Sequence, residues 1–247
     1  MNPTPAPGTG VNAALVLQCE PAMLRAGLHE PLWVLCTLHN PGEVPQRIDL
    51  GTGGVAAFHL DVQGPPGAVA RPDSGAVAGF GASGVTDLAA GATSRHLLLL
   101  QCWQGFELPG AYAVDISCRP EGADAGLVPK PVSMQVEVTG RRGTRLAVLC
   151  AQLAERAEQG HGVAGGLHPF DAALALSWVV DDTATPYLAR LVSGVPMLRP
   201  LALEGLARIA SPEARSFLQR WSHDADPELA ALAKRALRPL GGARTAD

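Results

Sequence analysis

One candidate nucleophile is Cys102, which stands directly before Trp103. A cysteine nucleophile reacts as the thiolate, so it needs a helix N-terminus or an imidazole within reach. Here the cysteine instead follows the leucine run at 97–100 and precedes a glycine-containing turn. We expect Cys102 to be a packed core residue, and we assign no catalytic residue to this chain.

Two groups of histidine and aspartate residues could suggest a metal site. His161, His168 and Asp171 form one group, but the glycine-rich spacer between the histidines fixes no geometry and no cysteine lies near. His59 and Asp61 share one side of a predicted strand, where a solvated polar face is the commoner arrangement. We therefore expect no metal ion, no cofactor and no enzymatic activity. The phosphate loop, the GxSxG elbow and the HExxH sequence are also absent.

Cysteine usage points to reduced thiols. The chain has five cysteines, an odd number, and none forms a CxxC pair. The opening segment reads MNPTPAPGTG, without the charged and apolar stretches of a secretion signal. We expect a cytoplasmic, bacterial-type protein with all five thiols unpaired and most of them buried. The five are Cys19, Cys36, Cys102, Cys118 and Cys150.

Length and charge limit the classes of partner. A chain of 247 residues predicts two domains. Residues 1–140 carry 6 basic and 12 acidic side chains, a net charge of −6, whereas residues 141–247 carry 13 and 11, a net charge of +2. That excess is too small to indicate a nucleic-acid partner. No apolar run approaches the roughly 18 residues of a membrane span, so no membrane partner is expected.

Alternating apolar residues predict an antiparallel β-sandwich over residues 11–140, after a flexible tail at 1–10. Apolar side chains recur at every second position in 132–138, 32–38 and 112–118, which puts one face of each strand in a core. Weaker strands are predicted at 14–19, 44–50 and 57–62. The segment 64–84 is mostly Gly, Ala and Pro, and we expect a mobile loop there, with a binding loop as the alternative.

One stretch of this region resembles a known family. Pro109-Gly110-Ala111-Tyr112 looks like the tyrosine corner of immunoglobulin-like domains, in which a Tyr hydroxyl bonds back to upstream backbone. Together with residues 88–106, it also resembles bacterial immunoglobulin-like domains, including the intracellular proteinase inhibitors of bacilli. The resemblance implies an immunoglobulin-like sandwich, and an inhibitor or regulator acting through its loops as one possible function. Val114 stands where the second disulfide cysteine of antibody domains would be, so no intersheet disulfide is implied.

The last hundred residues show a repeat of 27 to 28 residues. Leu-Ala pairs recur at 174–175, 201–202 and 229–230, and helix-start pairs of a small polar residue and proline precede three helices. Spacings of three and four residues predict amphipathic helices at 146–159, 188–192 and 214–221, with partner helices at 170–180, 200–210 and 227–237. The predicted helix starts are Thr185-Pro186, Ser211-Pro212 and Asp226-Pro227.

This period, with the ending Asp224-Ala225-Asp226-Pro227-Glu228, resembles short bacterial HEAT-type repeats. The resemblance implies antiparallel helix pairs stacked into a solenoid that binds other macromolecules. The alkylpurine DNA glycosylases are also HEAT-like, so a nucleic-acid repair enzyme remains an alternative, although such enzymes need a strongly basic groove. The aromatic and acidic residues that would serve such a site are Trp178, Asp181, Asp182, Trp221 and Asp224; core packing and helix capping explain the same residues.

We therefore predict a β-then-α chain: an immunoglobulin-like sandwich at 11–140, then a HEAT-like α-solenoid of about three helix pairs at 144–240, with a tail at 241–247. The predicted function is a non-enzymatic protein-binding module or scaffold that uses the concave face of the solenoid, the sandwich loops, or both. In such a stack, the polar positions of each second helix can form a ladder for a partner. The expected partner-binding residues are Arg199, Glu204, Arg208, Arg235 and Arg238, of which the four arginines form a mildly basic strip for an acidic protein surface.

Overall fold

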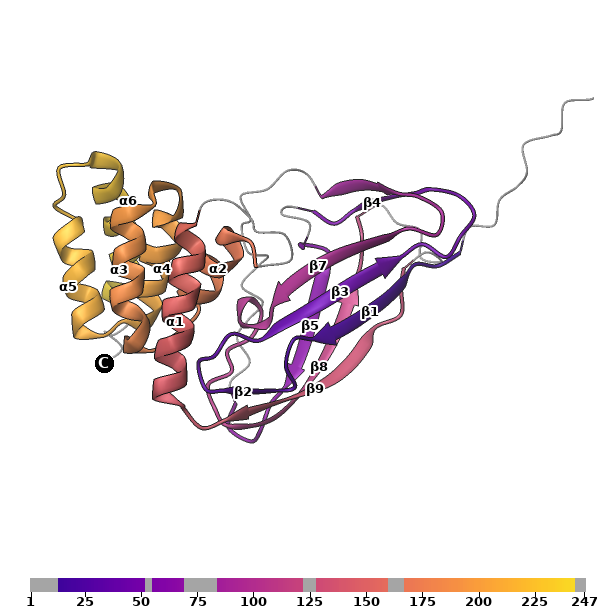
Figure 1. Cartoon of the computed structure of the whole chain (residues 1–247), viewed down its shortest axis with the longest axis horizontal. Helices are drawn as coiled ribbons and strands as arrows, with labels where there is room; N and C mark the ends of the chain where they lie inside the picture. Colours follow the sequence, from indigo (N-terminus) through magenta and orange to yellow (C-terminus); the bar gives the residue numbers. More distant parts are fainter. Residues whose placement is uncertain (1–12, 52–54, 69–83, 122–127, 160–166, 243–247) are drawn as a thin grey trace, which may run out of the picture. The chain divides into compact units, whose positions relative to one another are not determined.

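A computed structural model describes residues 13–51, 55–68, 84–121, 128–159 and 167–242, with side chains up to residue 238. The chain divides into two compact units (Figure 1). One consists of Met1–Ala26 and Leu32–Val138, and the other of Gly27–Pro31 and Thr139–Asp247. A β-sandwich-like region is thus followed by helices. No helix in the described part of the chain is both long and apolar enough to cross a bilayer.

The described residues of the β unit form two main sheets and a two-stranded ribbon. One sheet has the order β1-β3-β7, the second has the order β2-β9-β8-β5, and the ribbon pairs β4 with β6. The pairings β1–β3, β3–β7, β5–β8 and β8–β9 are all antiparallel. The strand bounds are β1 Val16–Pro21, β2 Arg25–Gly27, β3 Trp33–His39, β4 Gln46–Asp49, β5 Phe58–Gln63, β6 Val85–Leu88, β7 Thr93–Leu99, β8 Gly110–Cys118 and β9 Val132–Thr139.

Alternation of side chains builds the core between the sheets. In β3, Val34, Cys36 and Leu38 are fully buried while the residues between them are partly exposed, as the period of two predicts. In β8, the inward row includes Val114 and Ile116, also fully buried. The leucine run at 97–100 does not stay extended, because a short 3₁₀ turn, η2 (Leu100–Cys102), follows β7 and buries its three residues.

The predicted tyrosine back-bond is present. The Tyr112 hydroxyl donates to the Leu108 carbonyl at 2.8 Å and accepts from the Leu108 amide at 3.3 Å. The Tyr112 ring is fully buried, and the Phe106 ring packs edge-on against it with 4.9 Å between centroids. Burial raises the pKa of Tyr112. The tyrosine therefore fixes the turn that leads into β8. Of the expected loop at 64–84, residues 69–83 lie outside the described residues.

In the described part of the second unit there are six α-helices, with α4 at their centre. α1 packs against α2 and α3, α5 packs against α6, and α4 contacts α2, α3, α5 and α6. Leu188, Leu206 and Leu218 are fully buried between them. The bounds are α1 Gly143–Glu158, α2 Pro169–Ser177, α3 Thr185–Gly194, α4 Arg199–Ile209, α5 Pro212–Trp221 and α6 Pro227–Gly242, with 3₁₀ turns η4 Asp182–Ala184 and η5 Pro196–Leu198.

Helices begin at all three predicted starts, and the expected side-chain cap is present at two of them. The Ser211 hydroxyl accepts from the Ala214 amide at 3.2 Å, and Asp226 accepts from the amides of Glu228 and Leu229. Thr185 does not cap α3: it is buried, and its hydroxyl has no hydrogen-bond partner among the described residues. The reason is that η4 runs directly into α3, so the free amides lie one turn earlier, where Asp181 accepts from Thr183.

A short segment of the β region belongs to the helical unit, which the sequence did not suggest. Gly27–Pro31 is grouped with the helices. The Leu28 amide donates to the Thr139 carbonyl at 2.9 Å. Arg145 of α1 forms an ion pair of 3.1 Å with Glu30, whose side chain is only 1% exposed. A buried carboxylate is costly unless it is paired, so this ion pair ties the segment to α1.

Candidate functional site

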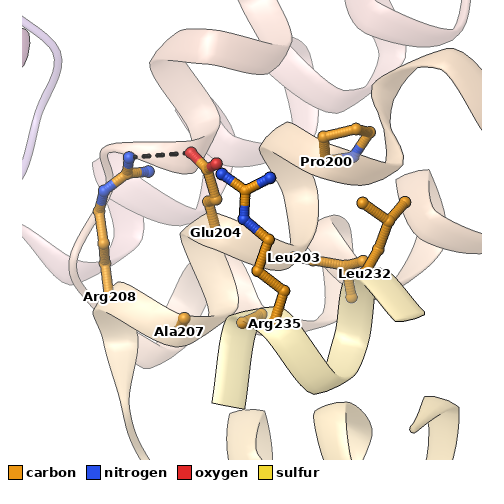
Figure 2. A pocket seen from close by; sticks show the side chains of 8 residues that line it. Pro200, Leu203, Glu204, Ala207, Arg208, Leu232 and Arg235 are labelled. Atoms are coloured by element: carbon orange, nitrogen blue, oxygen red, sulfur yellow. Dashed lines mark hydrogen bonds and ion pairs between the residues drawn. The ribbon is translucent and has the colours of Figure 1, made fainter. Parts of the chain in front are cut away.

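A pocket with a volume of about 460 Å³ lies between α4 and α6 (Figure 2). Its lining residues on α4 follow helical spacing, at i, i+3, i+4, i+7 and i+8 from Pro200, so one face of that helix lines it. On α6, the lining positions are i, i+3 and i+4 from Leu232. The lining residues are Pro200, Leu203, Glu204, Ala207 and Arg208 of α4, and Leu232, Arg235 and Ala236 of α6.

The pocket combines an apolar lining with charged groups. Five of its eight lining residues are apolar, and the other three are Glu204, Arg208 and Arg235. The structure thus brings together three of the five expected partner-binding residues. The two arginines give a net charge of +1 once Glu204 is counted. A mostly apolar cavity with a few placed polar groups is typical of a binding site.

Arg208 is held in place on three sides. Its guanidinium lies 4.0 Å from the centre of the Trp178 ring, a cation–π distance. One Nη donates to the Ser177 carbonyl at 3.2 Å, and the other pairs with Glu204 at 3.3 Å (Figure 2). Ser177 is the last residue of α2, where helix carbonyls lack intrahelical partners and attract cations. The Arg208 side chain remains 27% exposed, so part of its charge can still meet a ligand.

Arg235 is placed differently. Its side chain is exposed, and it forms no hydrogen bond or ion pair with any other described residue. Figure 2 shows it extending from α6 toward Glu204 of α4. Arg238 is also exposed, but it does not line the pocket. Arg208 therefore offers a fixed cation and Arg235 an adjustable one.

Arg199 does not line the pocket, and its side chain instead connects two helices. It donates to the Val192 carbonyl at 3.1 Å and pairs with Asp226 at 2.7 Å, with only 18% of its side chain exposed. Asp226 also caps α6, and the Arg199 guanidinium holds the pKa of Asp226 below its usual value. Arg199 thus links the C-terminal part of α3 to the start of α6.

The residues considered for metal binding or nucleophilic catalysis lie at a helix cap, on an exposed strand face or in the core. His168 is the N-cap of α2, where its Nδ1 accepts from the Phe170 amide at 3.2 Å. His59 and Asp61 lie on the exposed face of β5, as expected. Cys102 is buried in η2. His161 lies outside the described residues, and within those residues no three His, Cys, Asp or Glu side chains form a group able to hold a metal ion.

The residues considered for a repair enzyme are also engaged. Asp181 forms a two-point contact with Arg141, at 2.6 and 2.9 Å, and the Arg141 guanidinium holds the pKa of Asp181 far below its usual range. Asp224 accepts from the Asp226 amide at 2.9 Å. Trp221 is buried against Phe217. Capping and packing therefore account for these residues, while Trp178 supports Arg208. Asp182 is exposed in η4.

Sequence reasoning missed two parts of the site. It did not identify the apolar lining, although the spacing of Pro200, Leu203 and Ala207 on α4 and of Leu232 and Ala236 on α6 was visible as a second apolar face on each helix. It also missed the pairing of Arg208 with Trp178. Those residues are 30 positions apart, and only the packing of α2 against α4 brings them together.

Comparisons with known proteins give no family. No family model matches the chain, and no curated protein does. Among solved structures, a β-glucosidase from Listeria innocua in complex with isofagomine matches with a TM-score of 0.34 and 16% identity over 52% of this chain and 16% of that chain. The chain therefore spans only a small part of that enzyme.

Two further structures are similar to parts of the chain. The CARDB domain of a Pyrococcus furiosus protein, in complex with di-metal ions, has a TM-score of 0.30 and 8% identity over 53% of this chain and 96% of that chain. An alkylpurine DNA glycosylase from Pseudomonas fluorescens, bound to DNA with an abasic site analog, has a TM-score of 0.28 and 16% identity over 51% of this chain and 31% of that chain. At these values, the likenesses carry no functional argument.

Proposed function

We propose that the protein is a non-enzymatic binding module in which an immunoglobulin-like sandwich precedes a HEAT-like solenoid of three helix pairs. The helix contacts support this arrangement. α1 with α2, α3 with α4, and α5 with α6 are packed pairs, while first helices contact first helices (α1–α3–α5) and second helices contact second helices (α2–α4–α6). That nearest-neighbour pattern is the one expected of stacked repeats.

The proposed ligand is a short acidic segment of a partner protein that carries one large apolar side chain. The apolar side chain enters the pocket between α4 and α6, and a neighbouring carboxylate meets Arg208 and Arg235. The observation that carries this proposal is the fixed guanidinium of Arg208 at the edge of an apolar pocket. Because Trp178 and Ser177 already hold Arg208, ligand binding costs little conformational entropy of the Arg208 side chain. An arginine also pairs with a carboxylate through two parallel hydrogen bonds.

The direct test selects binding peptides from a random peptide library with the full chain as bait. We expect a consensus with a large apolar residue beside Asp or Glu, and we expect Arg235→Glu to weaken binding of the selected peptide at least tenfold. Arg215→Glu is the matched control, because Arg215 is exposed on α5 and does not line the pocket. Binding that survives Arg235→Glu, or a consensus without acidic residues, contradicts the proposal.

The other two functions predict different results, one in the peptide selection and one in a separate oligonucleotide-binding measurement. A proteinase inhibitor or regulator acting through the sandwich loops would select peptides whose binding ignores both arginine variants. A nucleic-acid repair enzyme would bind oligonucleotides with a steep dependence on salt, because each phosphate contact releases counterions. The net charge of +1 at the pocket supports the carboxylate ligand instead.

A further inference from the structure

Two cysteines stand opposite each other in the β unit. β1 and β3 pair antiparallel, and their register places Cys19 directly across from Cys36. The two sulfur atoms are 3.1 Å apart and share a hydrogen bond. Cys36 is fully buried, whereas Cys19 is partly exposed on β1, which is an edge strand of its sheet. Nothing in the pocket between α4 and α6 involves this pair.

This geometry fits a disulfide with little movement of the backbone. Opposite residues of an antiparallel pair have Cα atoms about 4.5–5.5 Å apart, and disulfides span Cα separations of about 4.4–6.8 Å. An S–S bond is about 2.05 Å long, so the two sulfurs need to approach by only about 1 Å. We propose that Cys19 and Cys36 are a redox modification site that forms one reversible disulfide, with a small-molecule disulfide such as glutathione disulfide as the oxidant.

The two thiols have different roles in this reaction. The hydrogen bond from Cys36 lowers the pKa of Cys19, while the hydrogen bond to Cys19, together with burial, raises the pKa of Cys36. The partly exposed Cys19 is therefore the attacking thiolate, since reactivity follows the thiolate form and its access to the oxidant. Cys36 is the resolving thiol, sheltered in the core until the first step has occurred.

The reaction balances in two exchange steps. The Cys19 thiolate attacks one sulfur of glutathione disulfide, which forms a mixed disulfide at Cys19 and releases one glutathione thiolate. Cys36 then gives its proton to solvent and attacks the Cys19 sulfur, which forms the Cys19–Cys36 bond and releases the second glutathione. Two protein thiols are oxidised, and one glutathione disulfide is reduced to two thiols. The product joins edge strand β1 covalently to β3.

The other three cysteines do not share this setting. Burial raises the pKa of Cys118 to about 12 and that of Cys150 to about 12. Cys102 is buried in η2. Cys118 is the one that could compete, because the charge of Cys19 also raises its pKa, which means that the two thiols interact. Cys118 is therefore the critical control.

The test treats the reduced full chain with glutathione disulfide at mildly alkaline pH, alkylates the remaining thiols and maps the peptides by mass spectrometry. The expected product has lost two hydrogens, contains a Cys19–Cys36 cross-link and carries alkyl groups on the other three cysteines. Dithiothreitol restores the starting mass, and the oxidised form has a higher Tm than the reduced form.

Variants separate the two steps. Cys36→Ser should stop at the mixed disulfide of Cys19 with glutathione, whereas Cys118→Ser should still give the cross-link. If a variant fails to fold, the peptide map of the natural chain decides alone. A cross-link that includes Cys118, a lasting glutathione adduct on Cys19 of the natural chain, or five free thiols after treatment overturns the proposal.

Discussion

Arg208 and Arg235 show how one residue type takes two roles in the same pocket. Arg208 stacks on Trp178 and bonds to the Ser177 carbonyl, so it joins α4 to the end of α2 as well as facing the pocket. Arg235 contributes only its charge, because it has no hydrogen-bond or ion-pair partner in the described part of the chain. Their charge and their polar positions on the second helices predicted both residues from the sequence, and only packing distinguishes them.

We therefore expect Arg208→Ala to destabilise the helical unit by about 1–2 kcal/mol, from the loss of a cation–π contact and of a charged hydrogen bond. Arg235→Ala should change stability by less than about 0.5 kcal/mol, as exposed substitutions usually do. Urea unfolding followed by far-UV circular dichroism measures both. Equal effects of the two variants would show that Arg208 is not held as the structure indicates.

The low pKa of Asp181 predicts how the stability of the fold depends on pH. Its pKa is depressed in the folded protein, chiefly by Arg141 and then by Thr183, so folding favours the ionised form. The unfolded chain, with an ordinary Asp pKa of about 3.9, takes up the proton first as the pH falls. The stabilisation is therefore complete above that value and is lost as the pH falls toward the folded pKa.

Asp181→Asn keeps a capping side chain but removes the charge. We expect it to be less stable than the natural protein at pH 7, with a difference that shrinks at about pH 3. Chemical denaturation at the two pH values measures the difference. The control is Asp182→Asn, an exposed neighbour in η4. A gap of the same size at both pH values would mean that the Arg141 contact does not depend on the charge of Asp181.

At the scale of elements, α4 depends on a glycine where it crosses α2. An ideal Cβ on Gly205 would lie 2.8 Å from the Ser177 Cα and 3.0 Å from a methyl group of Leu188. A backbone atom cannot move aside as a flexible side chain can, so the close approach of α4 to α2 requires glycine. The same approach lets Arg208 reach the Ser177 carbonyl one turn later.

Gly205→Ala should therefore destabilise the protein by about 1–3 kcal/mol, despite the roughly 1 kcal/mol that alanine gains over glycine as a helix former. Gly194→Ala is the matched control, because a Cβ there meets nothing within 4 Å at the end of α3. Thermal unfolding of the two variants gives the comparison. A stable Gly205→Ala protein would mean that α2 and α4 can move apart without cost.

The sequence predicted elements well where one residue pattern decides the structure. The period of two gave β3, β8 and β9, and Ser211 and Asp226 marked helix starts, because a short side chain caps the free amides next to it. Thr185 begins α3 as predicted but does not cap it, because the 3₁₀ turn η4 runs directly into the helix. The pocket could be predicted only in part, since the apolar spacing on α4 and α6 is local but the position of Trp178 beneath Arg208 is not.

At the scale of the whole molecule, neither of the two units is one continuous segment of the chain. Gly27–Pro31 interrupts the β unit yet belongs with the helices, since the Leu28 amide bonds to Thr139 and Glu30 pairs with Arg145. No composition change marks this segment, and His29 adopts a positive φ of 68° there, which is uncommon for a residue other than glycine. We therefore expect the stability of the segment Gly27–Pro31 to follow that of the helices.

The assignment of Gly27–Pro31 to the helical unit predicts which amides exchange hydrogen together. Gly205→Ala should speed exchange in residues 143–159 and 167–238 and also at Leu28, because the Leu28 amide is protected only while its acceptor Thr139 is held by the helical unit. Tyr112→Phe removes the hydroxyl that bonds to Leu108, so it should cost about 1 kcal/mol. It should speed exchange in β5, β8 and residues 132–138 of β9 while leaving Leu28 protected. Hydrogen–deuterium exchange with peptide-level mass spectrometry measures all of these segments in one experiment. If the Leu28 amide follows Tyr112→Phe instead of Gly205→Ala, the segment Gly27–Pro31 is part of the β unit in energetic terms, and Glu30 does not anchor it to α1.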